Sequence, residues 1–176
     1  MTSVDSASAE ARPTHRLFWS TIVVAIVVIL VDQLSKWWAV AALADGRRFP
    51  VIGQLIQFVL VYNPGAAFSI GTGSTWVFAI LAAVAVAVIG WLAWRVGSKR
   101  WSVALGFLLG GAATHLGDRL FRAPGFGRGH VVDFIDYAGL FIGNFADIAI
   151  FTGVVMLAVL TLAGVRLRGG PGTTRK

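Results

Sequence analysis

The chain has 176 residues, is 57% hydrophobic with a mean hydropathy of +0.78, and carries a formal net charge of +7. This composition is too apolar for a soluble domain and indicates an integral membrane protein of one domain with short connections. Cysteine is absent, which excludes disulfides, thiolate metal ligands and a cysteine nucleophile. The basic residues cluster at the ends of apolar segments, so membrane topology explains the positive charge better than nucleic-acid binding does.

Four apolar segments of helical length follow one another, and we expect each to cross the membrane. The predicted helices cover residues 17–42, 76–96, 101–119 and 141–165. The third is rich in glycine, which allows close packing on neighbouring helices. Together they predict a single membrane domain over residues 15–166. The polar ends, residues 1–14 and 167–176, are expected to be disordered.

Residues 44–73 have a different pattern. Asp45-Gly46 is a turn signal, and residues 49–62 contain Val, Ile, Phe and Tyr with interspersed Gly and Gln, which is typical of short strands. Asn63-Pro64-Gly65 breaks this pattern. We therefore expect a small extramembrane β segment that rests on the membrane surface.

The distribution of Lys and Arg predicts the orientation in the membrane. Nine of them lie in the two termini and the 95–100 loop, against four in the 44–73 and 120–140 segments. Both termini are therefore expected in the cytoplasm, with the 44–73 and 120–140 segments outside.

Acidic residues on three predicted helices lie toward the outer leaflet. At about 1.5 Å per residue, Asp32 is about 22 Å from the cytoplasmic start of its helix and Asp147 is about 9 Å below the outer end of its own. Asp118 and Arg119 end the third helix on the outer side, and Asp133 in the outer loop can reach the same layer. This shared depth predicts a polar, water-accessible pocket near the outer leaflet, because charges inside a membrane usually mark function.

Several of these polar residues have two possible roles. Asp32 and Lys36 share a helix face at i, i+4, where they could form a structural ion pair or face a substrate. Asn63 could close its turn, donate to a peptide carbonyl or hold a carboxylate. Asp118-Arg119 could be an interfacial charge pair, or Arg119 could hold a neighbouring carboxylate.

Metal and serine chemistry have little support. His115 lacks the helical His/Glu spacing of a zinc site, so no metal or other cofactor is expected. Ser35 and Lys36 are adjacent and therefore point to different faces of their helix.

Asp133 and Asp147 remain as the candidates for chemistry. Two carboxylates that share a site cannot both ionise cheaply, so one keeps a proton. The ionised member can then take a proton from water while the neutral member donates to a carbonyl oxygen. The alternative is that Asp133 is an ordinary loop residue and Asp147 bonds to a neighbouring helix. The residues alone leave both interpretations open.

The motifs, in this order, resemble those of the lipoprotein signal peptidase (signal peptidase II) family of bacterial membrane aspartic peptidases. The resemblance spans nearly the whole chain and is carried by residues 32–36, 63–68, 110–112, 118–119, 131–135 and 144–147. The runs at 118–125 and 129–130 look actinobacterial.

The resemblance implies four transmembrane helices with an extracytoplasmic β-cradle and a short periplasmic helix. It implies that Asp133 and Asp147 are the catalytic dyad that activates water. The residues implied to bind substrate or support the site are Asp32, Lys36, Asn63, Gly65, His115, Asp118, Arg119 and Asn144.

The implied substrate is a prolipoprotein whose cysteine already carries diacylglycerol, and cleavage before that cysteine releases the signal peptide. The implied location is the bacterial cytoplasmic membrane, with the active site toward the outer leaflet. Membrane lipid is the other expected partner, nucleic acid is not, and a monomer is expected.

The chain departs from the usual family pattern at three places near the predicted dyad. Thr114-His115 stands where Gly-Asn is usual, Gly143 stands where Phe is usual, and Ile148 follows Asp147 where a small residue is common. His115 can still donate a hydrogen bond, although histidine titrates near neutrality. These departures keep open a non-catalytic membrane assembly factor with the same fold.

A small transporter is the other alternative, with Asp32, Asp118 and Asp147 on an ion path. It would need polar residues through the full membrane thickness, whereas residues 76–96 are almost wholly apolar.

Overall fold

The computed structural model describes residues 15–65 and 74–168. The expected N-terminal disorder, the end of the 44–73 segment and most of the expected C-terminal tail lie outside the described residues. Leu167, which we expected in that tail, accepts a 2.8 Å hydrogen bond from the backbone N–H of Gly97. The described chain therefore remains packed to its last residues.

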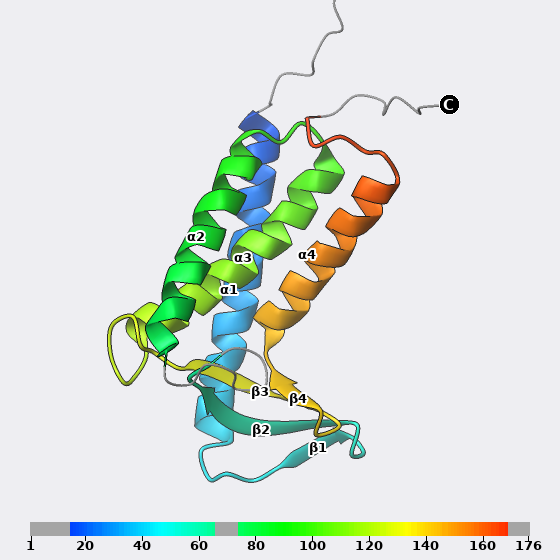
Figure 1. The fold of residues 1–176 in the computed structure, drawn as a ribbon. Coiled ribbons are helices and arrows are strands. Elements are labelled where there is room, and N and C mark those ends of the chain that lie inside the picture. The colour runs from blue at the N-terminus through cyan, green and yellow to red at the C-terminus, as the bar shows by residue number, and fades with distance from the viewer. Residues whose placement is uncertain (1–14, 66–73, 169–176) are drawn as a thin grey trace, which may run out of the picture.

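Four helices form a bundle, and a four-stranded sheet lies across one end of it (Figure 1). The helices are α1 His15–Ala42, α2 Thr75–Trp94, α3 Lys99–Phe121 and α4 Phe145–Leu162. The strands are β1 Phe49–Ile52, β2 Ile56–Asn63, β3 Val131–Tyr137 and β4 Phe141–Gly143. No separate short helix of the kind implied for the periplasmic side occurs within residues 15–65 and 74–168.

Three helices, α1, α2 and α4, are long and apolar enough to cross a membrane. Large apolar side chains, among them Val23, Leu81 and Val154, are exposed along them, as a lipid-facing surface requires. Within the described chain, α3 is long enough but less apolar than these three helices, because it contains glycines, His115 and charged residues at both ends. The protein is therefore an integral membrane protein with three clear candidate spans.

The central helix α3 packs closely on its neighbours through glycine. A Cβ at Gly110 would lie 2.6 Å from the Val28 Cβ of α1, and a Cβ at Gly111 would lie 2.5 Å from the Ile150 Cγ1 of α4. Both distances are too short for any side chain, so these glycines allow three helices to meet at one level.

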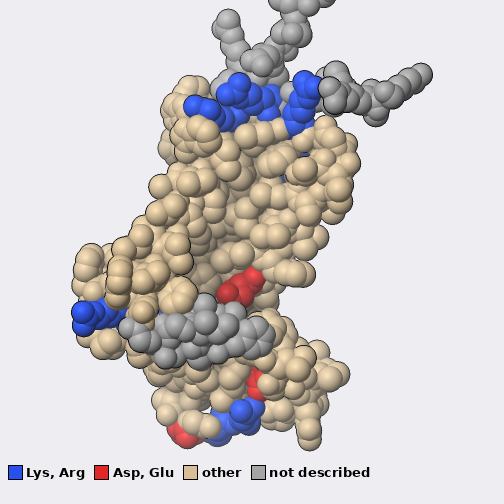
Figure 2. Space-filling view, in the orientation of Figure 1, with Lys and Arg blue, Asp and Glu red and all other residues tan. Residues whose placement is uncertain are grey.

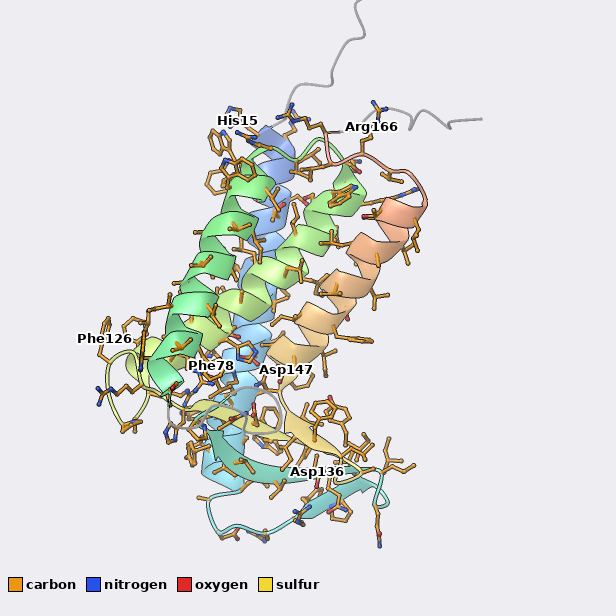
Figure 3. All side chains as sticks on the ribbon, viewed as in Figure 1. His15, Phe78, Phe126, Asp136, Asp147 and Arg166 are labelled. Carbon is orange, nitrogen blue, oxygen red and sulfur yellow. The ribbon has the colours of Figure 1, made fainter. Side chains whose placement is uncertain are left out.

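Charge is distributed unequally between the two ends of the molecule (Figure 2). On the face shown, basic side chains gather at the end of the bundle away from the sheet, and acidic side chains are seen only toward the sheet end, where further basic ones also lie. His15 and Arg166 lie at this basic end, whereas Asp147 and Asp136 lie at the sheet end (Figure 3). The two ends of the described chain are thus on the same side.

The sheet is antiparallel in the order β1-β2-β3-β4. All residues of β3 except Tyr137 are buried, and Phe134 packs with Ala39 and Leu43 at the end of α1. The expectation that Asp133 lies in a loop is wrong. The segment Val131–Tyr137 is a strand paired with β2 and β4, and it is buried on both faces. Its apolar and polar residues therefore do not alternate.

The last helix begins four residues later than residue 141, where we expected it. Phe141–Gly143 pairs with β3, and Asn144 is the N-cap of α4. Its side chain accepts a hydrogen bond from the Asp147 backbone N–H, which is the usual way to satisfy a free donor at a helix start.

A buried cation joins the helices near the sheet. The Lys36 ammonium is fully buried, 2.7 Å from Asp32 Oδ2 and 2.8 Å from Asp118 Oδ2. Both contacts are ion pairs, because neither has the direction of a hydrogen bond. Arg122 adds a 2.7 Å contact from Nε to Asp118 Oδ1. The predicted Asp32–Lys36 pair is present, but Asp118 pairs with Lys36 and Arg122 instead of with Arg119.

Replacing Lys36 with alanine should lower the free energy of unfolding by about 3–5 kcal/mol, because it leaves Asp32 and Asp118 buried without their shared cation. Chemical denaturation in detergent micelles measures this loss. The exposed pair Arg47–Asp45, at 2.6 Å, provides the control. Arg47→Ala should cost less than about 1 kcal/mol. Equal losses for the two variants would contradict the structural role of the buried cation.

Candidate active site

The strand β3 places Asp133 beneath the helices. Its pairing with β2 sets Val61 opposite Asp133, and the Asp133 side chain is almost fully buried. Two side-chain amides hold the carboxylate. Asn63 Nδ2 donates to Oδ2 at 2.9 Å, and Asn144 Nδ2 donates to Oδ1 at 2.6 Å. The prediction that Asn63 could hold a carboxylate is confirmed, and the same side chain also accepts a hydrogen bond from the Gly65 N–H at 2.9 Å.

The first turn of α4 places Asp147. Its Oδ2 accepts a 2.9 Å hydrogen bond from the backbone N–H of Asn144, which completes a capping box. Its Oδ1 lies 3.1 Å from His115 Nε2 on α3. The Asp147 side chain is 38% exposed, so it is accessible while it is held from two sides.

Asn144 connects the two aspartates. Its side-chain amide donates to Asp133, its side-chain oxygen accepts from the Asp147 N–H, and its own N–H donates to the Asp147 carboxylate. This fully buried residue therefore holds one carboxylate from the sheet and one from the bundle in a fixed relation.

The environment of Asp133 favours its neutral form. Burial raises the pKa of Asp133 to about 6, and the nearby Asp147 charge adds to this effect, although hydrogen bonds from Asn63 and Asn144 oppose it. The pKa of Tyr137, on the same strand, is raised for the same two reasons. A carboxyl group whose pKa is raised toward neutrality can act as an acid.

Arg119 organises the turn beside Asp133. Its Nη1 donates to the backbone oxygens of Asn63 at 3.0 Å and Gly129 at 3.1 Å, and its Nη2 donates to the oxygen of Gly65. The alternative that Arg119 forms a bidentate pair with a carboxylate is wrong. Its charge is used instead to join the end of β2 to the start of β3, where Asn63 and Asp133 lie.

A cavity of about 440 Å³ opens over the two carboxylates. The polar residues that line it are Asn63, Gly65, His115, Arg119, Asp133 and Asp147. Its apolar lining comes from Phe78 and Ala82 of α2, Val131 of β3, Phe141 and Ile142 of β4, and Phe151 of α4. Acidic side chains are visible in the hollow between the bundle and the sheet (Figure 2), and Asp147 points toward this region (Figure 3).

Four of the predicted site residues do not line the cavity. Asp32, Lys36 and Asp118 form the buried charge cluster, and Asn144 lies behind the two aspartates. Asp32 also accepts a 2.9 Å hydrogen bond from the Ala146 N–H, so it supports the start of α4. For Asp32 and Lys36 the contacts favour the structural alternative over a substrate-facing one.

Sequence reasoning missed the apolar lining and two members of the charge cluster. Gln33 Nε2 donates to Asp118 Oδ1 at 3.1 Å, and Arg122 Nη2 donates to Gln33 Oε1 at 3.3 Å. Gln33 could have been noticed as a further polar residue inside a predicted membrane helix. Phe78 and Phe151 carry no signal that separates a cavity wall from a lipid-facing surface.

The chain is similar to known proteins over most of its length. A family described as "Signal peptidase (SPase) II" matches residues 24–163. A protein named lipoprotein signal peptidase from Leifsonia xyli subsp. xyli is 47% identical over 148 residues, which is 84% of this chain and 68% of that protein. One from Mycobacterium avium is 42% identical over 159 residues, covering 90% of this chain and 87% of that protein.

The fold is also found among solved structures. A bacterial membrane enzyme determined by the in meso method at 2.3 Å is 27% identical to this chain, with a TM-score of 0.70. The similarity covers 82% of this chain and 88% of that one.

Replacing Asp133 with asparagine should make stability less sensitive to pH. The pKa of Asp133 in the folded state is about 6, above the ordinary 3.8, so folding favours the protonated form. The stability contributed by this group is complete below pH 4 and is lost as the pH rises through 6. As the pH rises from 4 to above 6, the free energy of unfolding of Asp133→Asn should increase relative to that of the wild type by up to about 3 kcal/mol, since one pKa unit corresponds to about 1.4 kcal/mol.

Thermal and chemical unfolding in micelles across this pH range measures the difference. The stability difference between the variant and the wild type is compared between pH values, so any effect of the amide on packing that does not depend on pH cancels. A difference in stability that does not change with pH would show that burial does not disfavour the Asp133 charge.

Proposed function

Because the chain belongs to the signal peptidase II family, whose members are membrane proteases of the aspartic type, we propose that it removes the signal peptide from diacylglyceryl-modified prolipoproteins by cleaving before the lipidated cysteine. The observation that carries the proposal is the placement of Asp133 and Asp147 on one cavity, with Asn144 bonded to both. The two carboxylates are the catalytic dyad.

The dyad works with one proton. Asp147 receives N–H donors on both oxygens, which suits an ionised carboxylate that takes a proton from the attacking water. Asp133 is buried and favours its neutral form, which suits an acid that donates to the oxygen of the scissile carbonyl. The proton belongs to the pair, so its pH dependence is a property of both groups. Hydrolysis by this route needs neither a metal nor a covalent intermediate.

The cavity walls suit a peptide joined to a lipid. The polar floor contains the dyad, whereas Phe78 and Ala82 of α2 and Phe151 of α4 form an apolar wall. Phe151 is 70% exposed on the outside of the bundle, so this wall is continuous with the lipid-facing surface. The cleaved segment must lose its helical structure locally, because a helix hides its own amide groups.

The arrangement in the membrane follows from charge and length. The 23 residues of α3 extend about 35 Å, enough to cross a hydrocarbon core of about 30 Å, so α3 is the fourth span. The basic end with His15 and Arg166 faces the cytoplasm, and the sheet and dyad face outward near the outer leaflet. The peptidase domain covers residues 15–166 and acts as a monomer without a cofactor, in contact with membrane lipid.

Asp133→Asn and Asp147→Asn should each abolish turnover, by at least about 10³-fold, since each removes one partner of a pair that acts as a unit. Cleavage of a diacylglyceryl-modified prolipoprotein by purified protein in micelles measures this loss. Asp136→Asn is the matched control. Asp136 is a buried aspartate on the same strand, but it bonds to Arg48 at 2.5 Å and to the Gly139 N–H at 2.8 Å. It does not line the cavity, so this variant should retain activity.

Normal cleavage by either dyad variant would overturn the proposed mechanism. No cleavage by the wild-type protein, with substrate that a known signal peptidase II cuts, would favour the assembly-factor alternative instead.

Single cysteines should report the proposed orientation directly, because the chain has none of its own. Lys99 and Arg128 are both exposed and lie at opposite ends of α3 and its following loop. With a membrane-impermeant maleimide on intact right-side-out vesicles, Arg128→Cys should be labelled and Lys99→Cys should be labelled only after permeabilisation. Labelling of both before permeabilisation would show that α3 does not cross the membrane.

A further inference from the structure

His115 is bonded to one member of the dyad. Its Nε2 lies 3.1 Å from Asp147 Oδ1, and the imidazole is 22% exposed in the cavity wall. The other oxygen of Asp147 accepts from the Asn144 N–H. The carboxylate is therefore held at both oxygens, and His115 contacts the oxygen that the Asn144 N–H does not reach.

The second unusual position, Gly143, meets the same carboxylate from the other side. A Cβ at Gly143 would lie 2.8 Å from Asp147 Oδ2. Any side chain there would have to displace the carboxylate or be displaced by it. Positions 115 and 143 are distant in the sequence, yet both act on Asp147. An imidazole holds one of its oxygens, and a bare backbone leaves room for the other.

The charged groups around His115 leave the dyad as its main electrostatic partner. From α4 it faces Asp147 and from β3 it faces Asp133, whose ionised form a cation at this position favours. The remaining groups on adjacent elements are already paired or bound. Lys36 and Asp32 of α1 pair with each other, Asp118 of α3 pairs with Lys36, and Arg119 of α3 binds backbone oxygens. The sequence of α2 contains no titratable side chain.

On the basis of the proposed function, we propose that His115 is a positioning residue that orients Asp147 through its Nε2–H, and that a positive charge on its imidazole narrows the pH range over which the dyad keeps its catalytic proton. Both the neutral tautomer with a proton on Nε2 and the imidazolium can donate to Asp147. They differ in charge. The imidazolium stabilises a dyad in which both carboxylates are ionised, and that form has no acid to donate to the scissile carbonyl.

Two substitutions separate positioning from regulation. His115→Gln retains an amide N–H at about the reach of Nε2 but cannot carry a charge. His115→Ala removes both the donor and the charge. The matched control is His15→Gln. His15 lies at the start of α1, at the end of the bundle away from the sheet, and its ring packs edge-on to Trp94. For each variant, kcat/KM for a diacylglyceryl-modified prolipoprotein is measured across the pH range in which aspartate dyads and histidine titrate.

We expect His115→Ala to lower kcat/KM by about 10- to 100-fold, the scale of one lost hydrogen bond to a charged group. His115→Gln should recover most of that loss. Its activity should also persist to higher pH than that of wild type, because no neighbouring cation then promotes loss of the dyad proton. His15→Gln should leave both the rate and the pH profile unchanged.

Wild-type kcat/KM in His115→Ala would overturn the positioning role. A basic limb of the pH profile that coincides in His115→Gln and wild type would overturn the regulatory role. Thermal unfolding of each variant is measured in parallel. If His115→Ala folds poorly, His115→Gln can still be compared with the wild type, because glutamine is similar in size to histidine. Failure of the proposed function is distinguishable from both outcomes. The wild-type protein itself would then not cleave the substrate, or Asp147→Asn would cleave it as the wild type does, whatever the His115 variants do.

Discussion

The arrangement of this protein depends on one buried cation. Lys36 pairs with Asp32 of its own helix and with Asp118 of α3, and Asp32 uses its other oxygen to accept from the Ala146 N–H at the start of α4. These contacts connect three helices at the depth where α4 begins. Because α4 carries Asp147 in its first turn, a charge cluster that does not line the cavity sets the position of a residue that does. Compared with apolar residues of the same volume, such a cluster often adds little net stability, so the loss expected for Lys36→Ala comes from the two carboxylates that it leaves without their shared cation.

The candidate site is formed where two different kinds of structure meet. Asp133 is held by the register of the sheet, opposite Val61 of β2, and Asp147 is held by the capping box of α4. Asn144 lies between the end of β4 and the start of α4, so its backbone and side chain can bond to both. The same buried surroundings that hold Asp133 also raise its pKa, which is how a carboxyl group can retain a proton near neutral pH.

Hydropathy and charge were sufficient to predict the helices, their approximate limits and a polar site near one end. Depth along the helices brought Asp32, Asp118 and Asp147 to one level because the rise per residue is constant. The strand β3 could not be predicted in the same way, since a strand covered on both faces lacks alternation and follows a Gly/Pro loop. The partners of Arg119 are backbone oxygens, which any residue type can supply, so no residue pattern encodes them. The late start of α4 could have been predicted from Asn144 and Asp147, which have the spacing of a capping box.

Because one carboxylate lies on the sheet and the other on the helical bundle, the protein can lose activity without losing its helices. Asp133 moves with the sheet and Asp147 moves with α4. Asn144, at the start of α4, bonds to Asp147 within the capping box and to Asp133 across the boundary. Sliding of the sheet against the helices would separate the carboxylates while every helix stays intact and embedded in lipid. Solvents that loosen this contact, such as short-chain detergents, should therefore inactivate the protein well before they unfold it. Helical content and activity are therefore two separate properties of this protein, and only activity depends on the contact between the sheet and the helices.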